Sequence, residues 1–597
     1  MKSFPRIRQA STRASIQQIL SAFITLLLLA GSIPAQTGTS SVSGQVLDPQ
    51  GEAVPGALVT LTSIETNAVR TQKTTDKGSF VFDLIPPGTY RVEVEAAGFK
   101  KAIVTDVRAL VSKPTDVPLQ LEVGSIAEAV SVSAGSTEAL INTQDATIGN
   151  NFVEKQIIQL PLESRNVVEL LSLQPGVTKE GYVSGSRSDQ ANITLDGIDV
   201  NEQQTGLDVI AANVDDEDQA FSSVLRVTPD SIQEFRVTTT NPNATQGRSS
   251  GAQVSLVTKS GTNSFHGGVY EFNRDTRFTA NNFFNNRTVD ENGNGLPTPK
   301  LNRNVFGGTF GGPIKKDRLF FFYSYEGRRD ESEKTVVQTV PLPSLGRGEV
   351  RFFNTSGGIT TLTTNQLNQL FPAVGINPLV APVLADAARR YPANDLTAGD
   401  GLNTSGFRFN APTPLRWNTH TVRFDYNPHP KHILSLRGNY QQDVVGRVPR
   451  FPDTPAPDFW SHPTGLAASH TWTISNSFVN NFRYGLTREA FSSQGDSSAN
   501  DIFFRFVFAP VDASRTLTRI TPVHNFVDDV SWIKGVHNFQ FGTNIRLIRN
   551  RRNSAASSFD QALTNPSFYE SAGGVLLEPI EGIADGFESP VQNAVAA

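Results

Sequence analysis

Three short stretches of the sequence hold residue types that could do chemistry. Residues 247–251, GRSSG, fit the GxSxG pattern, in which a nucleophilic serine, here Ser249, sits between a strand and a helix. That geometry needs an apolar strand before the serine, whereas polar NPNATQ precedes it and strand-like AQVSLVT follows it. We therefore expect Ser249 to be an ordinary polar residue and the protein not to be an enzyme.

The second stretch, residues 290–295 (DENGNG), begins like a calcium-binding loop. Its twelfth position is Leu301, where such a loop needs a bidentate glutamate. We therefore expect residues 290–295 to form a polar surface loop, with weak cation binding as the alternative. The chain has no cysteine, which excludes a redox motif, a disulfide framework and a thiolate metal site, and no metal or cofactor is expected.

The third stretch, residues 128–134 (EAVSVSA), is short, extended and alternating, with Glu128, Val130, Val132 and Ala134 on one face. An unpaired segment of this kind can add as a strand to the edge of a partner's sheet. The main-chain hydrogen bonds formed there could transmit a pulling force from the partner. The alternative is an ordinary strand or linker between two domains.

The elements around these stretches begin with a targeting segment. Four basic residues precede an apolar run over 19–30, and the small residues that follow it place the predicted cleavage site after Ala35. This order is typical of a secretory signal peptide, here residues 1–35, and the run is too short for a spanning helix. No later segment is long and apolar enough to span as a helix, so a membrane-embedded mature chain would have to be a closed β-barrel.

Two domains are predicted next. Residues 41–122 contain short strands separated by turn signals, and in TYRVEVE (89–95) apolar and polar residues alternate, which indicates a β-sandwich. Residues 123–264 have a mixed α/β texture, with a helical rhythm near 167–171 and strands at 192–196, 232–238 and 252–258. The fold class is therefore mainly β.

From 265 to 597 the strands alternate between an aromatic face and a polar or cationic face, as in HTVRFDY, NFRYGLT and FQFGTNIRL. Tight turns such as KKDR (315–318) and long polar loops such as 330–412 join them, which suits an antiparallel transmembrane barrel. We expect Tyr323 and Tyr325 on the lipid face and Arg328 and Arg329 at the strand's exit to solvent. A short loop helix is expected within 378–391.

These strings resemble known families. SGQVLDPQGEAVPGALVTL and PPGTYRVEVEAAGF resemble the carboxypeptidase regulatory-like, transthyretin-like domain, although no HxxE zinc pair is present. LPLESRN, LDGID and SGAQVSLVTKSGTN resemble the plug of TonB-dependent outer-membrane receptors of the Oar-like group, and RNVFGGTFGGPIKKDRLFFFYSYEGRR resembles their first barrel hairpin. The resemblance makes Asp196 and Gly197 the plug motif and residues 128–134 a TonB-box candidate.

The resemblance implies an outer-membrane receptor or transporter that binds an unknown extracellular ligand and takes energy from the TonB complex. Outer-membrane lipid is the implied surrounding, with the sandwich and the TonB-box candidate in the periplasm. The alternative is a secreted β-rich adhesion or surface-structural protein. Lysine and arginine are scattered and the net charge is −5, so no nucleic-acid partner is expected.

The barrel is also expected to be incomplete. Alternation marks about nine or ten strands in residues 265–597, whereas plugged transporters of this class have about 22. We therefore expect either a fragment of a longer product or further strands from another polypeptide.

Overall fold

The computed structural model describes residues 38–596 apart from several short gaps. These gaps are 126–128, 134–145, 161, 163–164, 179–181, 188–189, 202–222, 245, 290–292, 373–375, 456, 496–500, 505–514, 536, 556–560 and 565–578. The expected signal peptide, the first three residues of the calcium-like loop (290–292), and Glu128 and Ala134 therefore lie outside the described residues.

Residues 40–133 form two packed sheets, which we call the sandwich. One sheet has the order β4-β1-β7, with β8 also on β1, and the other has the order β3-β2-β5-β6-β9. Their bounds are β1 (Ser40–Leu47), β2 (Leu58–Ser63), β3 (Val69–Lys73), β4 (Ser79–Ile85), β5 (Gly88–Glu95), β6 (Lys101–Ala109), β7 (Pro114–Asp116), β8 (Leu119–Gln120) and β9 (Ala129–Ser133). The alternation in β5 is as predicted, because Tyr90, Val92 and Val94 are buried in the core between the sheets.

Residues 146–260 form a second unit, which we call the inner domain. Its five-stranded sheet has the order β10-β13-β14-β11-β12, and β11 runs parallel to β14. The bounds are β10 (Ile148–Val153), α2 (Glu154–Gln159), η1 (Val167–Leu173), β11 (Asn192–Leu195), β12 (Ile198–Asp199), η3 (Pro229–Ser231), β13 (Ile232–Thr240) and β14 (Gln253–Thr258). The helical rhythm predicted near 167–171 is a 3-10 helix, whose Val167, Val168, Leu170 and Leu171 are buried while its last residue, Leu173, is exposed.

The largest element is a twelve-stranded antiparallel sheet, which we call the wall. Its main path is β15-β16-β17-β21-β22-β23-β25-β27-β28, and β20, β24 and β29 pair alongside. The bounds are β15 (His266–Asp275), β16 (Leu301–Lys315), β17 (Leu319–Pro341), β20 (Thr404–Pro412), β21 (Leu415–His429), β22 (His432–Gly446), β23 (Asp458–Ser461), β24 (Thr464–Ser475), β25 (Phe478–Ser493), β27 (Leu517–Lys534), β28 (His537–Ile548) and β29 (Arg551–Ser554).

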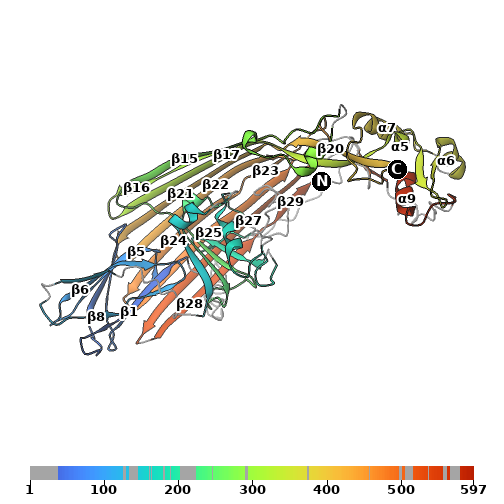
Figure 1. Ribbon diagram of the computed structural model, residues 1–597. Helices are drawn as coiled ribbons and strands as arrows, with labels where there is room; N and C mark the ends of the chain where they lie inside the picture. Colours follow the sequence, from blue (N-terminus) through green and yellow to red (C-terminus); the bar gives the residue numbers. More distant parts are fainter. Residues whose placement is uncertain are drawn as a thin grey trace, which may run out of the picture.

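The wall has one aromatic face and one polar face, as the alternation predicts. On β21, Phe424 and Tyr426 are 38% and 45% exposed, whereas Thr421 and Asp425 are buried on the opposite face. The inner domain lies against the polar face (Figure 1). The outer face therefore carries the aromatic side chains that the sequence assigned to lipid.

The β16–β17 hairpin is present, with KKDR as its turn, but one expectation about it is wrong. Arg328 does not lie at an exit to solvent: it is 4% exposed and ion-paired with Asp330 at 2.6 Å. Strand β17 continues to Pro341, because β20 pairs with its far half. Arg329, its neighbour, points to the outer face.

The long segment 330–412 contains a folded module rather than a bare loop. A hairpin and three helices share a core with a helix near the C-terminus. Their bounds are α5 (Pro343–Gly346), β18 (Val350–Phe353), β19 (Ile359–Leu362), α6 (Thr364–Leu370), α7 (Ala381–Arg390) and α9 (Glu588–Ala596). Helix α7 is the predicted loop helix. Figure 1 shows this far module at one end of the wall and the sandwich at the other.

Smaller elements complete the chain, namely η4 (Thr276–Phe278), α4 (Phe283–Arg287), β26 (Asp501–Phe504) and β30 (Gln561–Thr564). Among the residues that the structure describes, the helices are all too short or too polar to cross a membrane.

Candidate functional site: the contact between the inner domain and the wall

The LDGID sequence forms the hairpin between β11 and β12. Asp196 and Gly197 occupy its two-residue turn with φ of 51° and 74°, the conformation in which aspartate and glycine are favoured. A Cβ on Gly197 would lie 2.5 Å from Nη1 of Arg483 on wall strand β25. The turn residues predicted from sequence thus lie at the tip of a hairpin that touches the wall.

Asp196 binds two wall arginines. Its carboxylate lies 2.7 Å from Nε of Arg437 on β22 and 3.5 Å from Nη1 of Arg423 on β21. It also accepts hydrogen bonds from the backbone N–H and the hydroxyl of Thr258, both at 2.9 Å. Arg437 is 1% exposed, so its charge depends on this carboxylate for compensation.

Asp199, at the other end of the motif, binds a second pair of arginines. One is Arg248 from the inner domain, and the other is Arg546 on wall strand β28, whose Nη1 lies 2.8 Å from the carboxylate. Burial lowers the pKa of Arg248 to about 10, and the nearby charge of Arg546 acts in the same direction. Through its two aspartates the hairpin reaches β21, β22 and β28.

Two further inner-domain arginines hold the wall at other points. Arg226 pairs with Asp443 at 2.7 Å and lies over the Trp417 ring, 3.8 Å from its centroid. Arg165, from the LPLESRN string, pairs with Glu326 at 2.8 Å and Asp230 at 2.5 Å. Neither was marked by sequence reasoning, since the partners of Arg226 and Arg165 on the wall lie 217 and 161 positions away.

This contact is mainly polar, with a small apolar part where Ile198 packs on Ala467 and Val527 of the wall, and this determines what it can do. The guanidinium–carboxylate pairs are buried, and removing one partner of such a pair costs about 3–5 kcal/mol because the other charge stays uncompensated. Each pair fixes the position of the inner domain, yet the groups regain hydration if the domain moves away. Such a contact holds the inner domain in place chiefly through charged and hydrogen-bonded groups.

The sandwich also contacts the inner domain and the wall. The backbone N–H of Val111 donates to both carboxylate oxygens of Glu234 at 3.0 Å, and Nδ2 of Asn151 donates to one of them at 2.6 Å. Burial raises the pKa of Glu234 to about 7, more than these hydrogen bonds lower it. On the wall, Asp83 of the sandwich accepts from Asn538 and Gln540 at 3.1 and 2.8 Å.

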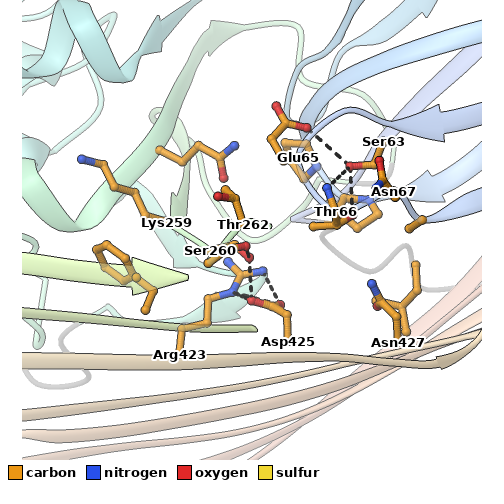
Figure 2. Close-up of a pocket in the computed structure, with 18 of the residues that line it drawn as sticks. Ser63, Glu65, Thr66, Asn67, Lys259, Ser260, Thr262, Arg423, Asp425 and Asn427 are labelled. Carbon is orange, nitrogen blue, oxygen red and sulfur yellow. Dashed lines mark hydrogen bonds and ion pairs between the residues drawn. The ribbon is translucent and has the colours of Figure 1, made fainter. Parts of the chain in front are cut away.

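A cavity of about 790 Å³ lies where the three units meet. Figure 2 shows its lining from the sandwich turn at 63–67, the inner-domain segment at 259–262, and Arg423, Asp425 and Asn427 of β21. Ser260 donates to Asp425 at 2.8 Å, and Asp425 binds Arg423 at 2.9 Å. The cavity therefore borders the same ion-paired network as the hairpin.

The TonB-box candidate is partly described. Val130 and Val132 lie in β9, which pairs in parallel with β6 at the edge of the sandwich sheet, whereas Glu128 and Ala134 lie outside the described residues. Within the described part of the chain, no strand pairs with the other edge of β9. The described part of the segment is a strand with one open edge, which is compatible with both interpretations, a TonB box and an ordinary strand.

Ser249 has the ordinary environment that the sequence predicted. Its hydroxyl donates to backbone carbonyls, that of Gln190 at 2.5 Å and that of Ala252 at 3.1 Å. Since every histidine of the chain lies at or beyond His266, the inner domain itself offers the serine no imidazole base.

Comparisons with known proteins agree with this architecture. The family model described as "Outer membrane beta barrel domain" matches residues 257–585, and the model "Carboxypeptidase regulatory-like domain" matches residues 41–122. The curated protein "TonB-dependent transporter Oar" from Myxococcus xanthus is 25% identical over 354 residues, which is 53% of this chain and 31% of that protein.

Two solved structures have a similar arrangement at 10% identity. The outer membrane transporter YddB from Escherichia coli gives a TM-score of 0.44 over 67% of this chain and 48% of its own. The ferric enterobactin receptor PfeA from Pseudomonas aeruginosa gives 0.41 over 68% and 50%. The chain spans about a third of the length of Oar and about half of these two structures. Because the barrel model spans more than half of the sequence, the chain belongs to the outer membrane β-barrel domain family.

Proposed function

We propose that the protein is an outer-membrane receptor that binds an extracellular ligand and moves it across the membrane with energy from the TonB system. The observation that carries the proposal is the LDGID hairpin, whose two aspartates bind arginines on three separate wall strands. The 25% identity to the transporter Oar supports the same function.

In this function the inner domain acts as the plug. It lies against the polar face of the wall, so it obstructs the space through which a ligand would pass. Opening a path requires breaking the contacts of Asp196, Asp199 and Arg226 with the wall. Apart from the stacking of Arg226 on Trp417, these contacts are ion pairs or hydrogen bonds, which water can replace when the domain shifts.

The energy would enter through residues 128–134, between the sandwich and the inner domain. The open edge of β9 could accept a strand from the periplasmic part of TonB. Because the segment leads directly into the inner domain at β10, a pull on it would reach the hairpin contact through the chain itself.

Binding of TonB to the full chain tests this proposal without knowledge of the ligand. Proline at 130 or 131 removes one backbone N–H, and adjacent residues of a strand direct their N–H groups to opposite edges. One of Val130→Pro and Ser131→Pro should therefore abolish binding of the purified C-terminal domain of TonB. Val130→Ala keeps the N–H and is the matched control.

Equal binding by all three variants would remove residues 128–134 from the proposal. Release of the wild-type protein from membranes by carbonate would remove the membrane function as a whole. That second result is the one expected of the alternative, a secreted adhesion or surface-structural protein.

A further inference from the structure

Two arginines lie directly opposite each other on the outer face of the wall. Arg329 on β17 pairs in register with Arg416 on β21. Their chain neighbours Arg328 and Trp417 are 4% and 3% exposed on the face that contacts the inner domain. Because side chains alternate along a strand, Arg329 and Arg416 point away from the inner domain, toward the surroundings of the wall.

Like charges directly opposite each other destabilise a sheet unless something neutralises them. Arg329 donates to the carbonyl of Trp417 at 2.6 Å and to Oδ1 of Asn418 at 2.7 Å, both of them uncharged acceptors. Arg416 is exposed. Among the described residues, no carboxylate forms an ion pair with either guanidinium. Glu331, the next acidic residue on that face of β17, binds Lys300 instead.

A shallow apolar groove adjoins this arginine pair. It has a volume of about 640 Å³, and its lining is mostly apolar or aromatic, with Val269, Phe306, Gly308, Phe310, Tyr323 and Tyr325. It also contains one carboxylate, Glu271, which pairs in register with Phe306. Gly308 forms part of its floor, where an added Cβ would lie 2.9 Å from the carbonyl oxygen of Gly268. The glycines and aromatics of FGGTFGG and LFFFYSY thus combine into one hollow on the outer face.

Phe306 connects the groove to the cations. Its ring lines the groove, contacts the Tyr325 ring at 6.2 Å and carries the Arg329 guanidinium at 5.5 Å from its centroid. The outer face therefore presents a mostly apolar hollow beside two arginines with which no carboxylate of the described residues forms an ion pair. A molecule with an apolar chain and an anionic head matches both features.

We propose that this surface is a binding site for a phosphorylated membrane lipid. The phosphate would lie between Arg329 and Arg416, which offer it charge-assisted hydrogen bonds, and an acyl chain would follow the groove over Gly308. Membership of the outer membrane β-barrel family makes lipid the surroundings of this face. The inference rests on that membership and not on transport or on TonB.

Native mass spectrometry of the full chain, extracted from membranes in mild detergent, tests the site. The wild type should retain a phosphorylated lipid. Arg416→Gln should reduce its occupancy about tenfold, since one charge-assisted hydrogen bond contributes about 1.5 kcal/mol or more. The double variant Arg329→Gln/Arg416→Gln should retain none. Arg318→Gln removes an exposed cation from the turn at the other end of β17 and should change nothing.

A second experiment separates the contribution of the lipid's acyl chain from that of its phosphate head group. Val269 is 92% exposed, so Val269→Trp can fill the groove without a clash inside the wall. It should reduce retention of the lipid and leave both arginines in place. If delipidated protein binds inorganic phosphate as tightly as it binds the lipid, the groove has no part and the proposal fails. Equal lipid retention by the arginine variants, or a dimer of this chain in place of lipid, would also overturn it.

Discussion

Asp196 and Asp199 are three positions apart, yet their carboxylates bind different parts of the wall. The tight turn makes this possible, because Asp196 and Gly197 both take positive φ and direct the hairpin tip into the arginine side chains. The turn itself could be predicted, since Asp-Gly between apolar residues is a strong local signal. Its partners could not, because an arginine on the polar face of a strand gives no sign of which carboxylate it will meet.

Replacement of Asp196 by asparagine tests the importance of this contact. The variant Asp196→Asn keeps one acceptor oxygen for the backbone N–H of Thr258 but leaves Arg437, which is 1% exposed, without a counter-charge. Its stability in detergent should fall by about 3 kcal/mol. Urea unfolding followed by tryptophan fluorescence measures the change. Asp458→Asn, at an exposed position, is the control, and equal loss in both variants would contradict the assignment.

Glu234 should make the attachment of the sandwich to the inner domain depend on pH. Burial raises its pKa from the usual 4.5 to about 7, more than the hydrogen bonds from Val111 and Asn151 and the charges of Arg236 and Lys113 lower it. A raised pKa means that the docked state binds the proton more tightly. The stabilisation is therefore full below pH 4.5 and is lost as the pH rises through 7, by about 3 kcal/mol in all.

Hydrogen exchange of the segment around Val111 measures this docking. After correction for the intrinsic rate, its protection should decrease between pH 5 and pH 8. In Glu234→Gln, which keeps an acceptor for the Val111 N–H but has no charge, protection should not change with pH. A wild-type profile as flat as that of the variant would show that Glu234 does not titrate in this range.

At the scale of elements, alternation in the sequence predicted the two faces of the wall strands well. It predicted less well where each strand ends. The strands around Phe424, Phe482 and Phe541 have the predicted faces, because one side packs on polar groups and the other lies outward. The end of β17 was misplaced at Arg328. That arginine looks like a solvent signal in the sequence, but Asp330 and the Trp417 ring compensate it within the sheet.

The far module was missed because its core joins distant segments. The backbone N–H of Thr355 donates to the carbonyl of Gly582 at 3.1 Å, and that of Ala584 donates to Phe353 at 2.9 Å. Helix α9 then buries Val591 to 1% exposure against the helices of residues 343–390. A local pattern within 330–412 cannot reveal a core that the last residues of the sequence complete.

A charge at Val591 should therefore loosen the far module and spare the wall. In Val591→Asp the buried carboxylate would detach α9, so protease cleavage within 343–390 should become faster. The wall strands should stay protected from the protease, since Val591 packs in the core of the far module and not against the wall. Ser589→Asp, on the exposed side of the same helix, should leave cleavage unchanged. Equal protection in both variants would show that α9 is not needed for the module.

At the scale of the whole molecule, composition and alternation predicted the units but not how they fit together. A mainly β chain with a sandwich and a two-faced sheet follows from local patterns, whereas the signal peptide over residues 1–35 stays a prediction. The docking of the sandwich does not, because Val111 meets Glu234 and Asp83 meets Gln540 across 123 and 457 positions. Such contacts depend on the shape of assembled domains, which no short window of sequence carries.

The two faces of the wall give the last prediction. Phe482 is 43% exposed on the outer face, while Arg483 beside it is 2% exposed on the inner one. If lipid covers the outer face, Phe482→Lys should cost about 2–4 kcal/mol and reduce insertion into the outer membrane. Carbonate washing and heat-modifiability gels measure insertion. Leu396→Lys, on a 93% exposed residue of the far segment, adds the same charge outside the wall and should insert normally. In a secreted soluble protein the outer face would meet water, and Phe482→Lys would raise solubility instead, so normal or improved yield of that variant would decide against the membrane.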